Sequence, residues 1–407
     1  MPDWIKAIIR EPIAVHPGHT SSRTHSLHAD TEEVTDEVRE TFLHHNRTYQ
    51  RCSVDRRIYL VPVDEDETIR LRIQYDVLAK VFDGRSIFPP MGALRRVLDC
   101  GFGTGMWAFQ VAWENPRCEA QEDPYTSSCD VSSWCCWGDV SSTVIGIDVS
   151  PHHYNPEESV ENLYLNVDNL NMPLSFPSNH FDLVNSRLVA GGIDRNRWQD
   201  YMRDILRCLR KGGWCQMVEI DYNAQSDNGT LTDGHALRQW SDKYSRAMSQ
   251  LKNVEAPRRL AHWMRQVGFT EVEERMIPLP MCGWSESPRE FDIGVHNQEN
   301  VRLLLGSLAL YPFTELLNMT ITEFHVLVAQ ARAEASNPAL KKAAALKSAG
   351  TSLAALPDRN IAAVERQGIR RVKADAGQTN LVDIVSLTRS YIPEKKGRGL
   401  DCMMEIV

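Results

Sequence analysis

Short apolar runs alternate with segments of helical spacing through the middle of the chain. A short apolar run indicates a buried strand, whereas apolar residues three and four positions apart indicate a helix. The expected strands are residues 97–99, 143–148, 160–167, 181–186, 214–220 and 271–279. The expected helices are a segment with apolar positions from Ile69 to Val81, then residues 106–112, 196–210, 232–252 and 256–267. This alternation predicts an α/β fold with a doubly wound, mostly parallel sheet that binds its ligand at the carboxyl ends of the strands.

The first predicted strand runs into a glycine-rich turn. Asp99 closes the strand, and the glycines that follow are Gly101, Gly103 and Gly105. A strand that turns through glycines into a helix brings backbone N–H groups and the positive helix end close to a nucleotide-like ligand. Glycine is needed because a Cβ would block that approach or forbid the backbone angles of the turn. A plain tight turn is the structural alternative.

The glycine spacing bears on the class of ligand. The dinucleotide fingerprint Gly-x-Gly-x-x-Gly would have its third glycine where this chain has Met106. Here the third glycine comes one residue earlier. The spacing therefore disfavours a nicotinamide-dependent oxidoreductase, which we keep as an outside alternative.

A second carboxylate, Asp148, ends the next predicted strand. An acid in this position, usually about 20 residues past the glycines, accepts hydrogen bonds from ribose hydroxyls. Here Asp148 lies 43 residues after Gly105, and the cysteine- and tryptophan-containing segment 117–142 accounts for the excess. We therefore interpret residues 117–142 as a surface insertion between helix and strand. It lacks a paired Cys-x-x-Cys motif, so we predict no metal site.

Composition narrows the functional classes. The 407 residues carry a formal net charge of −9, which argues against direct nucleic-acid binding because phosphate recognition requires clustered Lys and Arg. Apolar runs are too short to span a bilayer, so no membrane partner is expected. Scattered cysteines fit a reducing compartment. Residues 1–40 show no sustained period and predict a largely disordered arm.

The remaining segments define the expected layout. Residues 41–283 form the ligand-binding domain, and residues 284–335, helical by pattern and rich in large apolar side chains, form a cap over the ligand edge of the sheet. Ordinary helical packing against the domain is the alternative to a cap. Residues 336–407 form an atypical C-terminal extension that begins with an alanine-rich helix.

A set of motifs in order goes beyond a generic fold. The glycine turn resembles motif I of the class I S-adenosylmethionine-dependent methyltransferases. The further motifs are Ile147-Asp148, Asp168-Asn169-Leu170, Phe181-Asp182-Leu183-Val184, Ser186-Arg187-Leu188, Trp198, Leu209-Arg210-Lys211-Gly212-Gly213-Trp214 and Val218-Glu219-Ile220-Asp221. Together they resemble the LaeA-like fungal methyltransferases, which include regulators of secondary metabolism and enzymes of secondary-metabolite clusters. The similarity covers roughly residues 43–340 without the insertion.

The resemblance implies S-adenosylmethionine as the cofactor and a set of residues that bind it. Asp99 and the three glycines would line its methionine and ribose side, and Asp148 would accept hydrogen bonds from the ribose hydroxyls. Asp168 and Asn169 would face the adenine. Asn185 and Ser186 would lie near the sulfonium and the path of the methyl group.

The family also implies an antiparallel strand soon after residues 337–340, and here the chain departs into residues 341–407. Either residues 379–391 supply this strand from a distance or the sheet edge is incomplete.

Methyl transfer from a sulfonium depends mostly on holding the nucleophile in line with the methyl group. A base is required only if the acceptor must first lose a proton. Weak candidates for such a base are His235, Glu219 and His325, although each is more often a structural polar residue.

Three hypotheses remain. The chain is a cytoplasmic enzyme that methylates a small secondary metabolite, or it is a nuclear regulator that acts through a protein partner. The third hypothesis is a degenerate cofactor-binding protein. The N-terminal arm is short and carries no clear basic import signal, which favours the enzyme.

Overall fold

The computed structural model describes residues 7–8, 32–116, 142–155, 160–226, 229–340 and 342–351. All of them belong to one unit, residues 1–353, and a second unit, residues 354–407, lies outside the described residues. The predicted insertion at 117–142 also lies outside them, apart from Ser142.

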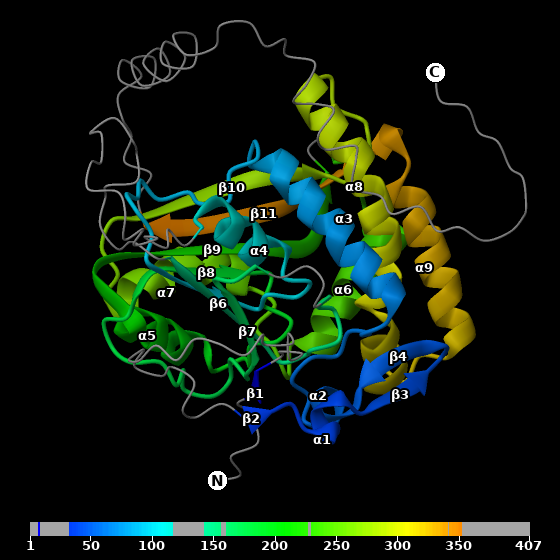
Figure 1. The fold of residues 1–407 in the computed structure, drawn as a ribbon. Coiled ribbons are helices and arrows are strands. Elements are labelled where there is room, and N and C mark those ends of the chain that lie inside the picture. Colours follow the sequence, from blue (N-terminus) through cyan, green and yellow to red (C-terminus); the bar gives the residue numbers. More distant parts are fainter. Residues whose placement is uncertain are drawn as a thin grey trace, which may run out of the picture. The chain divides into compact units, whose positions relative to one another are not determined.

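Five parallel strands form the centre of the sheet in the order β9, β8, β5, β6 and β7 (Figure 1). Their bounds are Arg96–Cys100 for β5, Thr143–Asp148 for β6, Leu163–Val167 for β7, Phe181–Arg187 for β8 and Leu209–Ser226 for β9. The strand order changes direction at β5, because β6 and β8 lie on either side of it. Ligands of such sheets bind where the order reverses, at the carboxyl ends of the strands. The predicted doubly wound α/β fold is therefore confirmed.

The antiparallel strand beside β9 comes from an unexpected segment. β11 (Lys342–Thr351) lies between β9 and β10 (Val272–Pro280) and pairs antiparallel with both. The expected alanine-rich helix after residue 340 is thus wrong, because pairing with two strands outweighs the helix preference of alanine. The strand also does not come from residues 379–391, which lie outside the described residues.

Part of the N-terminal arm also joins the sheet. β1 (Ala7–Ile8) pairs antiparallel with β7, and β2 (Glu32–Glu33) pairs parallel with β1. A short helix, α1 (Asp36–Arg39), follows. At these residues the structure differs from the expected disordered arm, whereas residues 1–6 and 9–31 lie outside the described part.

Helices cover both faces of the sheet. On one face, α5 (Trp198–Cys208) and α7 (Ala256–Val267) enclose an apolar core that includes the stacked rings of Trp198 and Trp263. On the other face, α4 (Met106–Glu114) packs on β6 and β7 and contacts α3 (Glu65–Val81). The alternation of strands and helices along the sequence thus becomes a three-layer arrangement.

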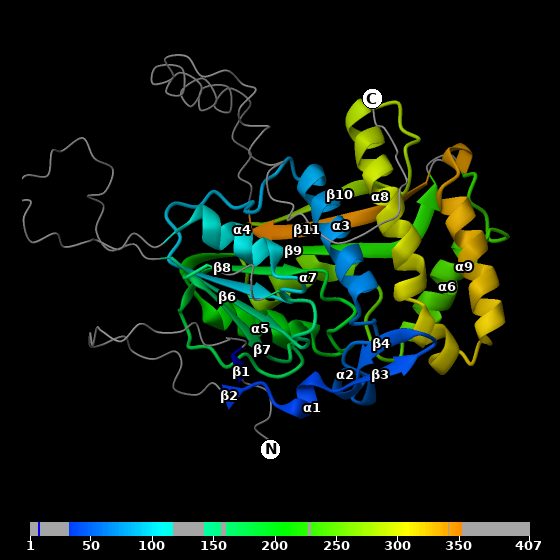
Figure 2. The same ribbon diagram turned by 45° about the vertical axis from the view of Figure 1, so that its right-hand side comes forward.

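The remaining helices gather beside the sheet around a second apolar core (Figure 2). They are α6 (Ala236–Met248), α8 (Pro288–Ser307), the π-helix Pro312–Leu316, α9 (Ile321–Ala335) and the 3-10 turn Pro338–Leu340. The hairpin of β3 (Thr41–His44) and β4 (Arg47–Gln50) leads into α2 (Arg51–Asp55) before α3. The helical character predicted for residues 284–335 is present.

Close backbone packing makes Gly294 of α8 a sensitive position. A Cβ at Gly294 would lie 2.1 Å from the carbonyl oxygen of Cys282, and backbone cannot yield as a side chain can. We expect Gly294→Ala to lower the free energy of unfolding by about 1–3 kcal/mol, measured by urea denaturation. Gly234→Ala is the control, because the nearest atom to its Cβ would be 3.8 Å away. Equal stability of the two variants would contradict this packing.

Candidate functional site

The glycine turn after β5 adopts the backbone that its sequence predicts. Gly101, Gly103 and Gly105 have φ angles of +77°, +56° and +79°, in the left-handed region that favours glycine. A Cβ at Gly101 would also lie 2.5 Å from Cγ1 of Val189. The turn ends at Gly105, which precedes the first residue of α4. The start of this helix is thus brought to the carboxyl end of the sheet.

Asp148, at the end of β6, holds this turn directly. Its Oδ2 accepts a hydrogen bond from the Gly103 N–H at 2.9 Å, and its Oδ1 accepts one from the Ser150 N–H at 3.0 Å. Burial raises the pKa of Asp148, and the two N–H donors oppose that shift. The turn and the second acid therefore meet, although the segment 117–142 separates them along the sequence.

A chain of buried polar side chains crosses the neighbouring strands β5, β8 and β9. Asp99 Oδ1 accepts from Asn185 Nδ2 at 2.7 Å, and Asn185 Oδ1 accepts from Gln216 Nε2 at 2.9 Å. Burial raises the pKa of Asp99 to about 7, while the Asn185 hydrogen bond and the Arg187 charge act against it. The orientation of Asn185 is therefore fixed from both sides.

A cleft lies at the carboxyl edge of the sheet. Predicted site residues in its wall are Asp99, Gly101, Gly103, Asp148, Asp168, Asn169 and Asn185. Asp168 and Asn169 follow β7, and each caps the loop locally: Asp168 Oδ1 accepts from the Asn169 N–H, and Asn169 Oδ1 accepts from the Asn171 N–H. Much of the remaining wall is apolar or aromatic, including Leu78, Phe102 and Trp107.

Two predicted residues do not line the cleft. Gly105 lies behind the turn, where a Cβ would be 3.5 Å from Leu165 and Tyr154 side-chain atoms. Ser186 is buried on the opposite face of β8 from Asn185, where it accepts a hydrogen bond from the Tyr201 hydroxyl at 3.0 Å. Successive side chains of a strand point to opposite faces, so the two neighbours cannot share one cleft.

The three candidate bases are also absent from the wall of this cleft. His235 precedes α6 and bonds to Thr232, and His325 is exposed on α9. Glu219 of β9 is buried behind the loop that follows β8. Its Oε1 accepts from the N–H groups of Val189 and Ala190 at 2.8 and 3.1 Å. Its geometry is that of a residue that positions this loop.

Glu219 should make stability depend on pH. Burial raises the pKa of Glu219 to about 8, well above the value of about 4.3 in an unfolded chain. The folded state therefore binds the proton of Glu219 more tightly than the unfolded state does. The contribution of this proton to the free energy of unfolding is lost as the pH rises from about 4.5 through 8. Relative to wild type, Glu219→Gln should gain on the order of 3–5 kcal/mol between pH 5 and pH 9, measured by urea unfolding. A difference that stays constant with pH would contradict the shift.

Sequence reasoning missed a wall of the cleft that comes from α3 and the segment before it. Tyr59, Gln74 and Tyr75 line the cleft together with Arg187 at the end of β8. Arg187 could have been found, because it lies two positions after Asn185 on the same face of the strand. The α3 residues could not, since helical spacing alone does not show which face of the domain a helix covers.

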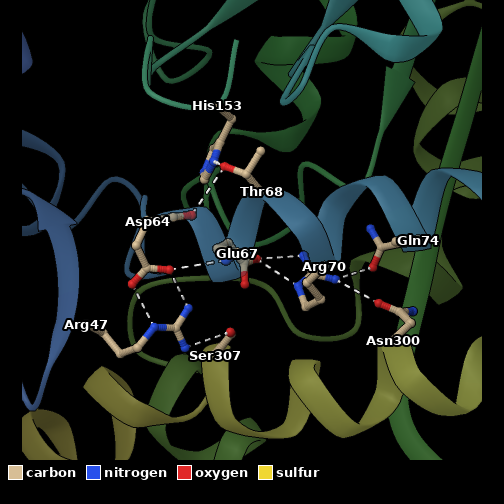
Figure 3. Close-up of polar contacts among 9 residues, drawn as sticks. All are labelled: Arg47, Asp64, Glu67, Thr68, Arg70, Gln74, His153, Asn300 and Ser307. Atoms are coloured by element: carbon tan, nitrogen blue, oxygen red, sulfur yellow. Dashed lines mark hydrogen bonds and ion pairs between the residues drawn. The ribbon is translucent and has the colours of Figure 1, made fainter. Parts of the chain in front are cut away.

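Buried and half-buried polar contacts fix α3 against its neighbours (Figure 3). At its start, Asp64 pairs with Arg47 of β4 at 2.7 Å, and Thr68 bonds His153 of the loop after β6 at 2.8 Å. One turn further, Arg70 donates to Glu67 Oε1 at 2.7 and 2.8 Å and to Asn300 of α8 at 3.1 Å.

These contacts come from β4, from the loop after β6 and from α8. They fix the helix that supplies Gln74 and Tyr75 to the cleft. Within the described residues, Oε2 of the buried Glu67 has no hydrogen-bond partner. The segment 284–335, predicted as a cap, contacts α3 through Asn300 and Arg47 of β4 through Ser307. It supplies none of the described residues that line the cleft.

The described residues contain neither a metal-binding group nor a membrane-spanning helix. Within the described ranges, no three His, Cys, Asp or Glu side chains form a group able to hold a metal ion. Among the helices in those ranges, none is both long and apolar enough to cross a bilayer.

Comparison with known proteins identifies similar chains. The model of a family described as "Methyltransferase domain" matches residues 71–274. The secondary metabolism regulator laeA of Monascus pilosus is 28% identical over 337 residues, which cover 81% of this chain and 82% of that protein. The protein-methionine methyltransferase laeA of Emericella nidulans is 28% identical, over 72% of this chain and 71% of that one.

Solved structures with some likeness include phosphoethanolamine N-methyltransferase 2 of Haemonchus contortus in complex with S-adenosyl-L-methionine. It is 19% identical, with a TM-score of 0.38. The matched region covers 68% of this chain and 52% of that chain, so this chain spans about half of it.

Proposed function

Since this chain belongs to the LaeA-like S-adenosylmethionine-dependent methyltransferases, we propose that it methylates a small secondary metabolite. The observation that carries the proposal is the hydrogen bond between Asp148 and the glycine turn, at the edge of the sheet where such enzymes bind their cofactor. The cleft itself supports a small acceptor, because apolar and aromatic side chains of α3 line it.

The residues present fit the cofactor. The turn at Gly103 presents backbone without a Cβ, and a Cβ there would meet no atom within 4 Å, so free space adjoins the turn. We assign Asp99, Gly101 and Gly103 to the methionine and ribose side, with Gly105 setting the backbone of the turn behind them. Asp148 would accept hydrogen bonds from the ribose hydroxyls, and Asp168 with Asn169 would contact the adenine.

S-adenosylmethionine, when bound, supplies a methyl group on a good leaving group. The protein has then mainly to orient the acceptor and exclude water, because alignment gives most of the rate advantage. Asn185 is held from both sides and is our candidate for orientation near the reacting atoms. Ser186 supports the strand from its other face. A catalytic base is required only for an acceptor that must lose a proton.

The second candidate is a regulator of secondary-metabolite genes that acts in the nucleus through protein partners. It is favoured by the similarity to laeA proteins that are described as secondary metabolism regulators. An enzyme of small metabolites would work in the cytoplasm instead.

Radiolabelled cofactor separates these functions. The purified protein is incubated with a fungal lysate and S-adenosylmethionine labelled in its methyl group, and label is counted in the organic extract and in precipitated protein. Label in the organic extract, absent with the Asp148→Ala variant, is expected. Label in protein alone would favour the regulator, and no transfer despite cofactor binding would indicate a degenerate enzyme.

A further inference from the structure

The cleft contains a cationic side chain, Arg187. Arg187 is half-buried and lines the cleft, with its guanidinium carbon 5.9 Å from the centre of the Tyr75 ring. Within the described residues the guanidinium makes no hydrogen bond and no ion pair. This differs from the other buried arginine near the cleft, Arg70, which bonds Glu67, Gln74 and Asn300. Keeping a charge out of water without a partner is costly, so the group is poised for an anion.

The neighbouring charge of opposite sign is Asp99. Asp99 pairs in register with Asn185 across β5 and β8, and Arg187 lies two positions further on the same face. Burial raises the pKa of Asp99, and the nearby Arg187 charge offsets part of that rise. One Asp99 oxygen is taken by Asn185, and the other makes no hydrogen bond within the described residues. A carboxyl group and a guanidinium thus line one cleft.

We propose that Arg187 binds the α-carboxylate of the amino-acid end of the cofactor, next to Asp99, which faces its ammonium group. This inference rests on the proposed function, because it takes S-adenosylmethionine to occupy the cleft. A carboxylate and an ammonium group on one carbon atom need receptors of opposite sign that lie close together, and Asp99 with Arg187 meets that need. A guanidinium suits a carboxylate because it can donate two parallel hydrogen bonds.

A carboxylate of the methyl acceptor would be bound by the same chemistry. The position of Arg187 favours the cofactor, since its backbone adjoins the glycine turn: a Cβ at Gly101 would lie 3.8 Å from the Arg187 carbonyl oxygen. The two sources can be separated with ligands that differ only in the amino-acid end.

The test measures binding of two compounds by titration calorimetry with the full chain. S-adenosylhomocysteine carries the amino-acid end, and 5′-methylthioadenosine lacks it. Arg187→Gln should weaken S-adenosylhomocysteine binding about 10- to 100-fold, as expected for a charge-assisted pair, and change methylthioadenosine binding less than about threefold. Arg187→Lys should recover part of the affinity. Arg259→Gln, which removes an exposed cation 6.0 Å from the Trp263 ring, should change neither.

Other outcomes overturn the assignment. Equal weakening of both compounds by Arg187→Gln would mean that the arginine only supports the structure. Unchanged binding of both compounds, together with a raised KM for the acceptor, would mean that Arg187 binds a carboxylate of the acceptor and not that of the cofactor. Wild-type protein that binds neither compound would remove the proposed function, and this assignment with it.

Discussion

The variant Asp148→Ala should lose at least about 100-fold in affinity for S-adenosylmethionine, measured by titration calorimetry. Two losses combine in this variant. The carboxylate proposed to accept from both ribose hydroxyls disappears, and each charge-assisted hydrogen bond contributes about 1.5–3 kcal/mol. The Gly103 N–H also loses its acceptor, so the turn is no longer held to β6.

Controls separate the loss of the ligand contact from the loss of the turn. Asp148→Asn keeps an oxygen for the Gly103 N–H and should fall between wild type and the alanine variant. Asp200→Ala removes an exposed acid of α5 and should bind like wild type. Wild-type affinity in Asp148→Ala, with thermal unfolding unchanged, would remove the ribose role of this residue.

Arg70→Met should be the most destabilising single change around the cleft, lowering the free energy of unfolding by about 3–5 kcal/mol in a urea titration. Glu67 is fully buried, and within the described residues its carboxylate accepts hydrogen bonds only from Arg70, which is 3% exposed. Removing the arginine leaves a buried carboxylate without compensation (Figure 3).

The matched control is Arg203→Met, which breaks an ion pair of the same sequence spacing with Asp200 on the surface. It should cost less than about 1 kcal/mol, because exposed pairs contribute little. Adding Glu67→Gln to Arg70→Met should restore part of the stability, since the unpaired charge is then gone. Similar losses in Arg70→Met and Arg203→Met would show that burial of the pair does not matter.

The parts of the site that could be predicted are those set by local pattern. Positive φ angles at three glycines and an acid at the end of β6 follow from residue type and order, so even a long separation along the sequence did not hide Asp148. Ser186 shows the limit: the motif includes it, but the alternation of the strand turns it away from the cleft and brings Arg187 in.

What could not be predicted depends on contacts between distant segments. The alanines of β11 favour a helix in isolation, and only pairing with β9 and β10 makes them a strand. Arg70 of α3 and its partner Asn300 of α8 are 230 residues apart, and spacing within one helix does not reveal such a contact. A lone histidine such as His325 carries no pattern that distinguishes a surface residue from a base.

The position of β11 has a consequence for synthesis of the protein. β10 joins the rest of the sheet through β11, so when translation has passed residue 280 the ribosome has not yet supplied the strand that connects β10 to β9. Until about residue 351 has emerged, two long strand edges stay open to pairing with other chains. A nascent chain of this protein therefore depends on its last described strand to escape aggregation.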